Sequence, residues 1–201
     1  MIMAEIKLFN KWSTENIKVN DPGLRKYIAL PNFIIPRTFG RNTEARFGKS
    51  KSHIVERLMG KIIATGHKGK KHFRTSGTFT GKGTHAYNIV LKSLELVEKE
   101  TKENPVAVLI KAVENAAPRE EITTIEYGGA RYSQAVDCSP QRRVDIALRQ
   151  ITQGAYSKSF NKKKQIYEAL ADEIVKSYKT DQGSQAISKK LEIERQADSS
   201  R

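Results

Sequence analysis

The residues best suited to chemistry in this chain lie between positions 77 and 84, where glycines surround a single lysine. The run Gly77-Thr78-Phe79-Thr80-Gly81-Lys82-Gly83-Thr84 resembles a loop that holds the phosphates of a nucleotide. One residue too few separates its first two glycines, and Gly83 stands where a Ser or Thr should reach magnesium. We therefore expect the backbone N–H groups and Lys82 to contact an RNA phosphate rather than to hydrolyse a nucleotide.

The other reactive side chains do not combine into a catalytic or metal site. Lys and Arg surround the histidines and would repel a cation, so we expect the histidines to make polar contacts with nucleic acid or simply to be solvated. Cys138 has no activating histidine nearby in sequence. We expect it to be a small packing residue that is buried or half-buried. Glu120 and Glu121 are expected to be salt-bridge partners. The sequence predicts no enzyme, no metal and no cofactor. The four histidines are His53, His67, His72 and His85.

Basic residues are concentrated in two segments. The chain has 201 residues and a formal net charge of +14. Residues 48–83 carry a net charge of +8 and residues 140–164 a net charge of +6, so these two segments hold the whole excess. Concentrated Lys and Arg displace counterions from a phosphate backbone, which favours a nucleic-acid partner. The Gly-, Thr- and Ser-rich residues 66–83 lack the bulky apolar anchors of a membrane-bound basic helix, so we expect no membrane partner.

Composition places the chain in a reducing, intracellular compartment. A single cysteine cannot form an internal disulfide. No apolar run approaches the roughly 20 residues that a membrane span needs, and residues 1–10 lack the pattern of a secretion signal. The hydrophobic fraction of 38% is enough to fill one core. We expect two regions, an N-terminal extension at residues 1–47 and a helical RNA-binding domain at residues 48–201.

The elements that must position the basic residues are mostly helical. Apolar residues recur at spacings of three and four, which predicts about six helices. Pro105 and Pro140 each follow a capping residue, Asn104 and Ser139, and proline is common at the first position of a helix. The expected helices begin near residues 52, 84, 105, 140, 167 and 184.

One stretch breaks the helical rhythm. Residues 122–127 and 131–136 are rich in β-branched and aromatic residues, and Gly128-Gly129 between them can supply the positive φ angles of a tight turn. We expect a β-hairpin at residues 119–138 that leans on helices or on a partner, because an isolated hairpin is marginal in water. The fold class is therefore mostly α, a bundle of about six helices with one protruding β-hairpin arm.

The first 47 residues have a mixed character. Pro22, Pro31 and Pro36 prevent a long helix there. The segment also holds five aromatic residues that could pack on the domain or on a partner, and the sequence leaves both possibilities open. They are Phe9, Trp12, Tyr27, Phe33 and Phe39.

An ordered set of motifs resembles a known family, the universal small-ribosomal-subunit protein seven, number five in the eukaryotic naming. The resemblance covers about residues 50–201. Ile54-Val55-Glu56-Arg57-Leu58 is similar to the archaeal and eukaryotic branch, and Arg46-Phe47-x-Lys49 is similar to the N-terminal extension of that branch. The motifs that occur in order are Gly81-Lys82, Glu114-Asn115-x-x-Pro118, Gly128-Gly129, Asp137-x-Ser139-Pro140-x-Arg142-Arg143-Val144 and Ala169-Leu170-Ala171-Asp172-Glu173.

The resemblance implies a structural constituent of the small ribosomal subunit in the cytoplasm. It implies binding to the 3′ major (head) domain of the small-subunit rRNA, support of head assembly, and contact with other head and platform proteins. It also implies that the hairpin lies near the exit-site tRNA and the mRNA exit path. The hairpin residues expected there are Tyr127, Gly128, Gly129, Ala130, Arg131 and Tyr132.

The predicted rRNA-binding residues come from the two basic segments. The resemblance supports Lys82, the pair Arg142-Arg143 and the stretch 158–164, while the charge pattern supplies the rest. Because the segments are separated by the hairpin, we expect two RNA-facing surfaces with an arm between them. The full set is Lys49, Lys51, Arg57, Lys68, Lys70, Lys71, Arg74, Lys82, Arg142, Arg143, Arg149, Lys158, Lys162, Lys163 and Lys164.

Two other functions fit the sequence less well. A free-standing RNA-binding regulator would share the basic segments but would not associate stably with a ribosomal subunit. A nucleotide-dependent factor would use the loop at residues 77–84, and its nucleotide binding would depend on Lys82.

Overall fold

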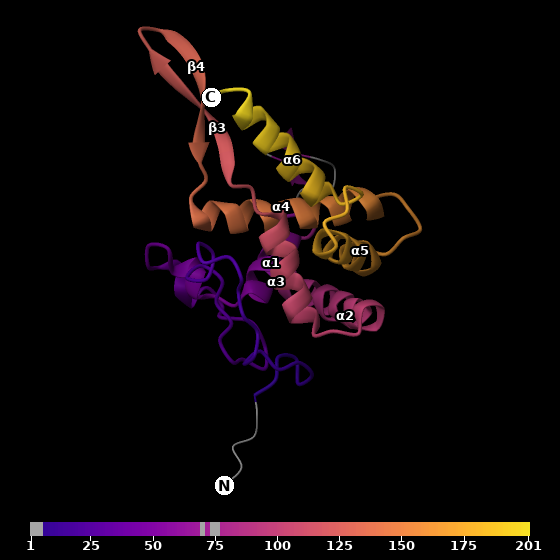
Figure 1. Cartoon of the computed structure of the whole chain (residues 1–201). Coiled ribbons are helices and arrows are strands. Elements are labelled where there is room, and N and C mark those ends of the chain that lie inside the picture. The colour runs from indigo at the N-terminus through magenta and orange to yellow at the C-terminus, as the bar shows by residue number, and fades with distance from the viewer. Residues whose placement is uncertain (1–5, 69–70, 73–76) are drawn as a thin grey trace.

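The computed structural model describes residues 6–68, 71–72 and 77–201 (Figure 1). Within these residues, six α-helices form a bundle from which one antiparallel hairpin projects. The predicted mostly-α bundle with a β-hairpin arm is confirmed. The helices are α1 (Ile54–Ile63), α2 (Gly83–Thr101), α3 (Pro105–Ala116), α4 (Pro140–Ser159), α5 (Ile166–Tyr178) and α6 (Gln185–Asp198), and the hairpin strands are β3 (Glu120–Tyr127) and β4 (Ala130–Asp137).

The helix starts follow local capping chemistry. The Asn104 side chain accepts a hydrogen bond from the Val106 N–H at 3.0 Å, and Pro105 occupies the first turn of α3, as predicted. At α4, Pro140 again stands in the first turn, but the Ser139 side chain makes no capping hydrogen bond. The capping prediction is therefore right in position at α4 and wrong in mechanism.

The bundle is organised around α5. Helices α2, α3 and α4 all pack against it, and its Ala169, Leu170 and Ile174 are at most 1% exposed. Helix α6 lies across α4 and runs alongside the base of the hairpin (Figure 1). The short buried stripe of α6, which includes Ala186 and Ile187, agrees with its thin apolar pattern.

The hairpin is anchored only at its base. Its strands pair in register from Glu120 opposite Asp137 to Tyr127 opposite Ala130. Gly128 and Gly129 make the turn with φ angles of 57° and 80°, a region that glycine adopts without strain. Beyond the base the strands are exposed, while Arg201, which follows the end of α6, forms an ion pair with Glu120 at the base.

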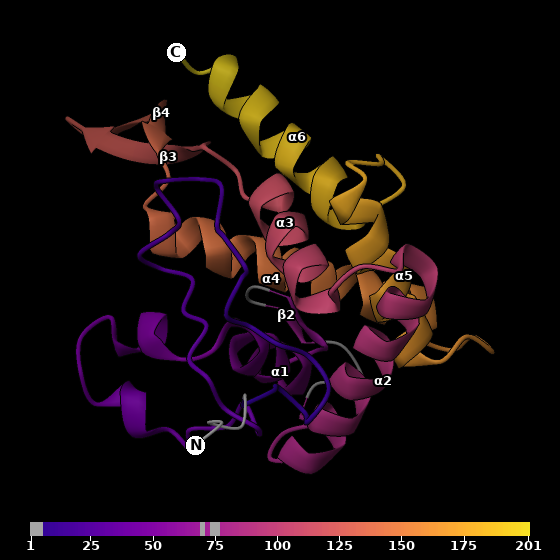
Figure 2. The same ribbon diagram turned by 60° about the horizontal axis from the view of Figure 1, so that its bottom comes forward.

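The N-terminal segment is part of the core. Leu8, Phe9 and Trp12 are at most 6% exposed and belong to the main hydrophobic cluster. Figure 2 shows the segment winding past α1 and α4. Of the aromatics whose partner the sequence left open, Phe9 and Trp12 therefore pack on the domain, whereas Phe33 and Phe39 stay 42% and 78% exposed.

Two short strands follow α1 in the first basic segment. They are β1 (His67–Lys68) and β2 (Lys71–His72), and they pair antiparallel, with His67 opposite His72. Backbone pairing in so short a segment leaves no periodic pattern in the sequence, so these two strands could not be predicted.

His53 does not behave as a solvated or RNA-facing residue. It is fully buried, and its Nδ1 accepts a hydrogen bond from the Val55 N–H at 3.1 Å, so it caps α1. Burial lowers the pKa of His53 to about 4. The expectation for this histidine was wrong because His is a rare capping residue and its spacing gave no sign of burial.

The buried cap makes stability depend on pH. The pKa of His53 is lower in the folded chain than its ordinary value of 6.5, so its contribution is complete above pH 6.5 and is lost as the pH falls towards 4. We expect the free energy of unfolding to fall by about 2 kcal/mol more between pH 7 and pH 5 in the wild type than in His53→Asn, which keeps a capping oxygen but does not titrate. Denaturant titrations at the two pH values measure this difference. Equal pH dependence in both proteins would contradict the assignment.

Candidate nucleic-acid interface

The two basic segments meet in the fold. Asp145 of α4 is the acceptor for cations from both η2 (Gly48–Lys51) and α1. Lys49 is hydrogen-bonded to it, Arg57 lies 3.3 Å from its Oδ1 and Lys61 lies 3.7 Å away. The expected two RNA-facing surfaces are thus partly one, because the first segment is joined to the N-terminal half of α4.

The electrostatics of Asp145 reflect this convergence. Burial alone would raise the pKa of its carboxyl, but the hydrogen bond from Lys49 and the charges of Lys61, Arg57 and Lys49 outweigh burial and hold the pKa below its ordinary value. Asp145 is therefore ionised at neutral pH and offsets part of the charge of three neighbouring cations.

Two of the predicted RNA-binding arginines are largely buried and make hydrogen bonds within the protein. The Arg57 side chain is 6% exposed, and besides Asp145 it donates to the Tyr27 carbonyl at 2.7 Å. The Arg143 side chain is 12% exposed and donates to the Pro118 carbonyl and to Asp21, at 3.0 and 2.8 Å. Both guanidinium groups join the N-terminal segment to the bundle, so we do not keep either as an RNA contact.

Arg142 has a different environment from its neighbour. It is 56% exposed and donates to Glu121 at the base of the hairpin, at 2.6 Å. Burial raises the pKa of the Cys138 thiol to about 11, and the charge and hydrogen bond of the same Glu121 add to this effect. Cys138 is 6% exposed, as expected, and remains an unreactive thiol at neutral pH. The prediction that Glu120 and Glu121 are salt-bridge partners is confirmed.

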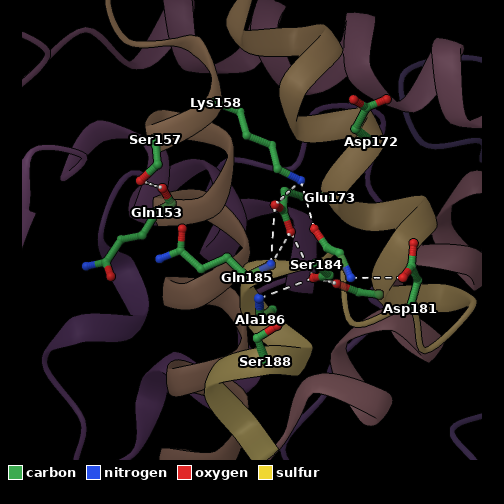
Figure 3. Close-up of polar contacts among 12 residues, drawn as sticks. Gln153, Ser157, Lys158, Asp172, Glu173, Asp181, Ser184, Gln185, Ala186 and Ser188 are labelled. Carbon is green, nitrogen blue, oxygen red and sulfur yellow. Dashed lines mark hydrogen bonds and ion pairs between the residues drawn. The ribbon is translucent and has the colours of Figure 1, made fainter. Parts of the chain in front are cut away.

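Lys158 also belongs to an internal network, shown in Figure 3. Its ammonium lies 2.6 Å from Oε1 of Glu173, a carboxylate with no exposed surface. Glu173 further accepts hydrogen bonds from the Ser184 hydroxyl at 2.8 Å and from the Gln185 N–H at 3.2 Å, at the start of α6. Gly154 leaves the room for this carboxylate, because a Cβ there would come 2.7 Å from it.

The remaining predicted cations fall into three groups. Lys164 is paired with Asp172 at the surface. Lys70 and Arg74 lie outside the described residues, and for Lys68 and Lys71 only the backbone is described. Within the described part of the chain the last group is exposed and forms no ion pair. Its members are Lys51, Lys82, Arg149, Lys162 and Lys163.

The hairpin tip is an exposed aromatic surface. Tyr127 is 82% exposed and Tyr132 is 60% exposed. Tyr132 does stand opposite Ile125 in the register, but both tyrosines remain largely exposed among the described residues. Arg131 is paired with Glu126 at 3.4 Å, so the tip carries little net charge.

The loop at residues 77–84 lacks the setting of a nucleotide site. Lys82 is exposed and precedes α2, and the guanidinium of Arg37 lies against Gly83, within 2.5 Å of where a Cβ would stand. Across the described residues, no group of three His, Cys, Asp or Glu side chains could hold a metal. Among the helices of the same residues, none is both long enough and apolar enough to cross a membrane.

The comparison with known proteins decides the family. The model of the family described as "Ribosomal protein S7p/S5e" matches residues 24–201. A relative described as "Small ribosomal subunit protein uS7", from Nanoarchaeum equitans (strain Kin4-M), is 54% identical over 197 residues, which are 98% of this chain and 100% of the relative.

The chain belongs to the ribosomal protein S7p/S5e family. The match to this family begins earlier than the motifs near residue 50 suggested, and the relative shares nearly all of the N-terminal segment as well. That agrees with the structure, where Leu24 and Ile28 lie in the core. The organising position of Asp145 could not be predicted from the sequence, where its one distinction is that it is the only acid within residues 140–164.

The structure distinguishes lysines that hold the fold from lysines that are free to bind. Removing the Lys158 ammonium in Lys158→Met would leave the buried Glu173 charge unpaired, and we expect a loss of about 2 kcal/mol of stability, less than for a fully buried pair because Lys158 is partly exposed. Lys162→Met, four residues away and exposed, should leave stability unchanged. Thermal and denaturant unfolding of the two variants measure the difference, and equal stabilities would refute the role of Lys158.

Proposed function

We propose that this chain is a structural protein of the small ribosomal subunit in the cytoplasm and that it binds the subunit's RNA. The observation that carries the proposal is the set of exposed Lys and Arg residues that have no acidic partner in the described part of the chain. They lie along the two basic segments of a chain that belongs to a family of ribosomal proteins. The name of the 54% identical relative supports the choice of the small subunit.

The two ends of α4 would contact different parts of the RNA. Helix α4 has 20 residues, so its ends are separated by roughly 30 Å. Arg149 lies with Lys49 near the N-terminal half, whereas Lys162 and Lys163 lie in the loop beyond the C-terminal end. Two anchor points, one near the middle of this helix and one beyond its C-terminal end, would fix the orientation of the bundle on RNA, which is the task of phosphate contacts.

The finer assignments follow from the resemblance of the sequence motifs. They are binding of the 3′ major (head) domain of the rRNA, support of head assembly, and contact with head and platform proteins. The hairpin would lie near the exit-site tRNA and the mRNA exit path. The exposed Tyr127 and Tyr132 and the near-neutral tip support an arm that probes shape and stacking more than it clamps phosphates.

Structural binding without catalysis is favoured over the two alternatives. A nucleotide-dependent factor would need an open anion site at the start of α2, where Arg37 lies against Gly83. Sedimentation distinguishes a free-standing regulator from a ribosomal protein, because the regulator would sediment apart from the small subunit. Co-sedimentation of the tagged full-length chain with small subunits in a sucrose gradient tests this directly.

The exposed lysines after α4, Lys162 and Lys163, should contribute to the salt dependence of RNA binding. Each neutralised phosphate contributes roughly 0.7–0.9 to the slope of log K against log salt, so Lys162→Gln with Lys163→Gln should reduce the slope by roughly 1.4–1.8. Filter binding to small-subunit rRNA over a range of KCl concentrations measures it. The matched control is Lys99→Gln with Lys102→Gln, which changes the net charge equally at exposed positions outside the basic segments. Equal slopes for the two double variants would contradict the proposed interface.

The hairpin arm should matter for tRNA and not for rRNA. Replacing Tyr127 and Tyr132 by Ser removes two exposed rings without touching the core, so rRNA affinity and folding should be unchanged. Small subunits reconstituted with this variant should hold deacylated tRNA at the exit site more weakly, by about 5-fold or more if one ring stacks on a base. Retention of tRNA equal to that of wild-type subunits would remove the arm from the proposal.

A further inference from the structure

A pocket lies between the N-terminal segment and α4. It has a volume of about 560 Å³, within the range of roughly 300–1,000 Å³ typical of ligand pockets. Asn42, Ala45 and residues 47–49 form one side, and Ser139 with the N-terminal half of α4 forms the other. In Figure 1 the violet N-terminal segment lies beside the end of α4 that adjoins the hairpin.

Phe47 is an exposed aromatic residue of the pocket lining. Its side chain is 62% exposed, and the Arg46 guanidinium lies 5.0 Å from the centre of its ring. An exposed ring beside an arginine is a common surface for stacking unpaired bases, because every base offers a π-face.

Gly48 fixes the position of Phe47. A Cβ at Gly48 would lie 1.9 Å from the Asn42 carbonyl oxygen, so only glycine allows the backbone to pass so close. Phe47 and Lys49 flank this glycine, and both line the pocket. Their placement at the pocket is therefore built into the fold of the segment.

The buried amide of Gln141 is a second feature of the pocket, independent of Phe47. It lines the same pocket and is only 6% exposed, yet neither its amide nitrogen nor its amide oxygen has a hydrogen-bond partner in the described part of the chain. An unpaired buried amide is destabilising, so such a group is expected to have a partner when the protein is at work. A side-chain amide offers donors and an acceptor together, as the edge of a nucleobase requires.

The charges around the pocket select the ligand. Lys49, Arg142 and Arg149 all line it, and Arg149 forms no ion pair among the described residues. Asp145 also lines the pocket, but its charge is already offset by Lys49, Arg57 and Lys61. A ligand with an apolar flat face, a hydrogen-bonding edge and an adjacent negative charge fits this lining.

We propose that the pocket receives one unpaired nucleobase of RNA. The base stacks on Phe47, and its flanking phosphates contact Arg149 and Lys49. The Gln141 amide, which is buried in the free chain, rotates towards the pocket and meets the edge of the base. This assignment rests on the proposed RNA-binding function and adds a site that reads a base to the phosphate contacts. It also gives the N-terminal segment a direct role, since that segment supplies the ring.

The test uses the full-length chain and ten-residue single-stranded RNAs of A, C or U, with 4-thiouridine for crosslinking. Phe47→Leu should weaken binding by about 5-fold or more, and the crosslinked peptide of the wild type should contain residues 42–49. The control Phe33→Leu removes another exposed ring of the same segment, one that does not line the pocket, and should bind as the wild type does.

Gln141→Leu separates recognition from stability. The change removes an amide without internal partners, so the melting temperature should stay the same or rise. The affinities for the three homopolymers should become more alike, because hydrogen bonding to the base edge is lost. Unchanged discrimination, or a clear loss of stability, would overturn the role of this amide.

The outcomes also distinguish this inference from the proposed function. If Phe47→Leu binds RNA as the wild type does while Lys162→Gln with Lys163→Gln weakens binding, the base pocket is refuted and the RNA-binding function stands. If the wild-type chain binds no RNA, the proposed function itself fails. Crosslinking of the pocket to a subunit protein instead of RNA would overturn the base assignment.

Discussion

Asp145 is the acceptor on which the arrangement of this molecule depends. It is half-buried on α4 and receives Lys49 from η2 and Arg57 and Lys61 from α1. Without that carboxylate, three cations would repel one another at the junction of α1 and α4. Arg57 also donates a hydrogen bond to the Tyr27 carbonyl, so the guanidinium that pairs with Asp145 also connects the N-terminal segment to the bundle. One acid thus permits a basic protein to bring its two basic segments together.

The cations of this chain have two kinds of environment. Arg57, Arg143 and Lys158 form ion pairs with Asp145, Asp21 and Glu173, and the first two are largely buried while Lys158 is partly exposed. Lysines and arginines such as Lys162 and Arg149 stay exposed without acidic partners in the described residues. A buried ion pair is costly to break from one side, whereas an exposed lysine is free to meet a phosphate. The first group therefore serves the fold and the second the proposed RNA partner.

The sequence predicted the elements well and the site less well. Apolar spacing, prolines such as Pro105 and the Gly128-Gly129 pair are local signals, so six helices and the hairpin turn could be read from them. The composition also indicated the polyanion partner. Burial of His53 and Arg57 could not be predicted, because a charged or polar residue on a helix gives no local sign of what will cover it. The pocket lined by Phe47 and Gln141 likewise joins positions almost a hundred residues apart.

By itself, the sequence determined the helical periodicity, the hairpin turn and the charge excess, because each depends on residues near one another in the chain. The ordered motifs were enough to indicate the family, which the match over residues 24–201 shows. Only the tertiary structure decided which cations are neutralised and which remain available, since an ion pair such as Arg143–Asp21 spans more than a hundred residues. It also turned the N-terminal segment from an extension into part of the core, because the apolar surface that buries Leu8 and Trp12 is assembled only when the chain folds.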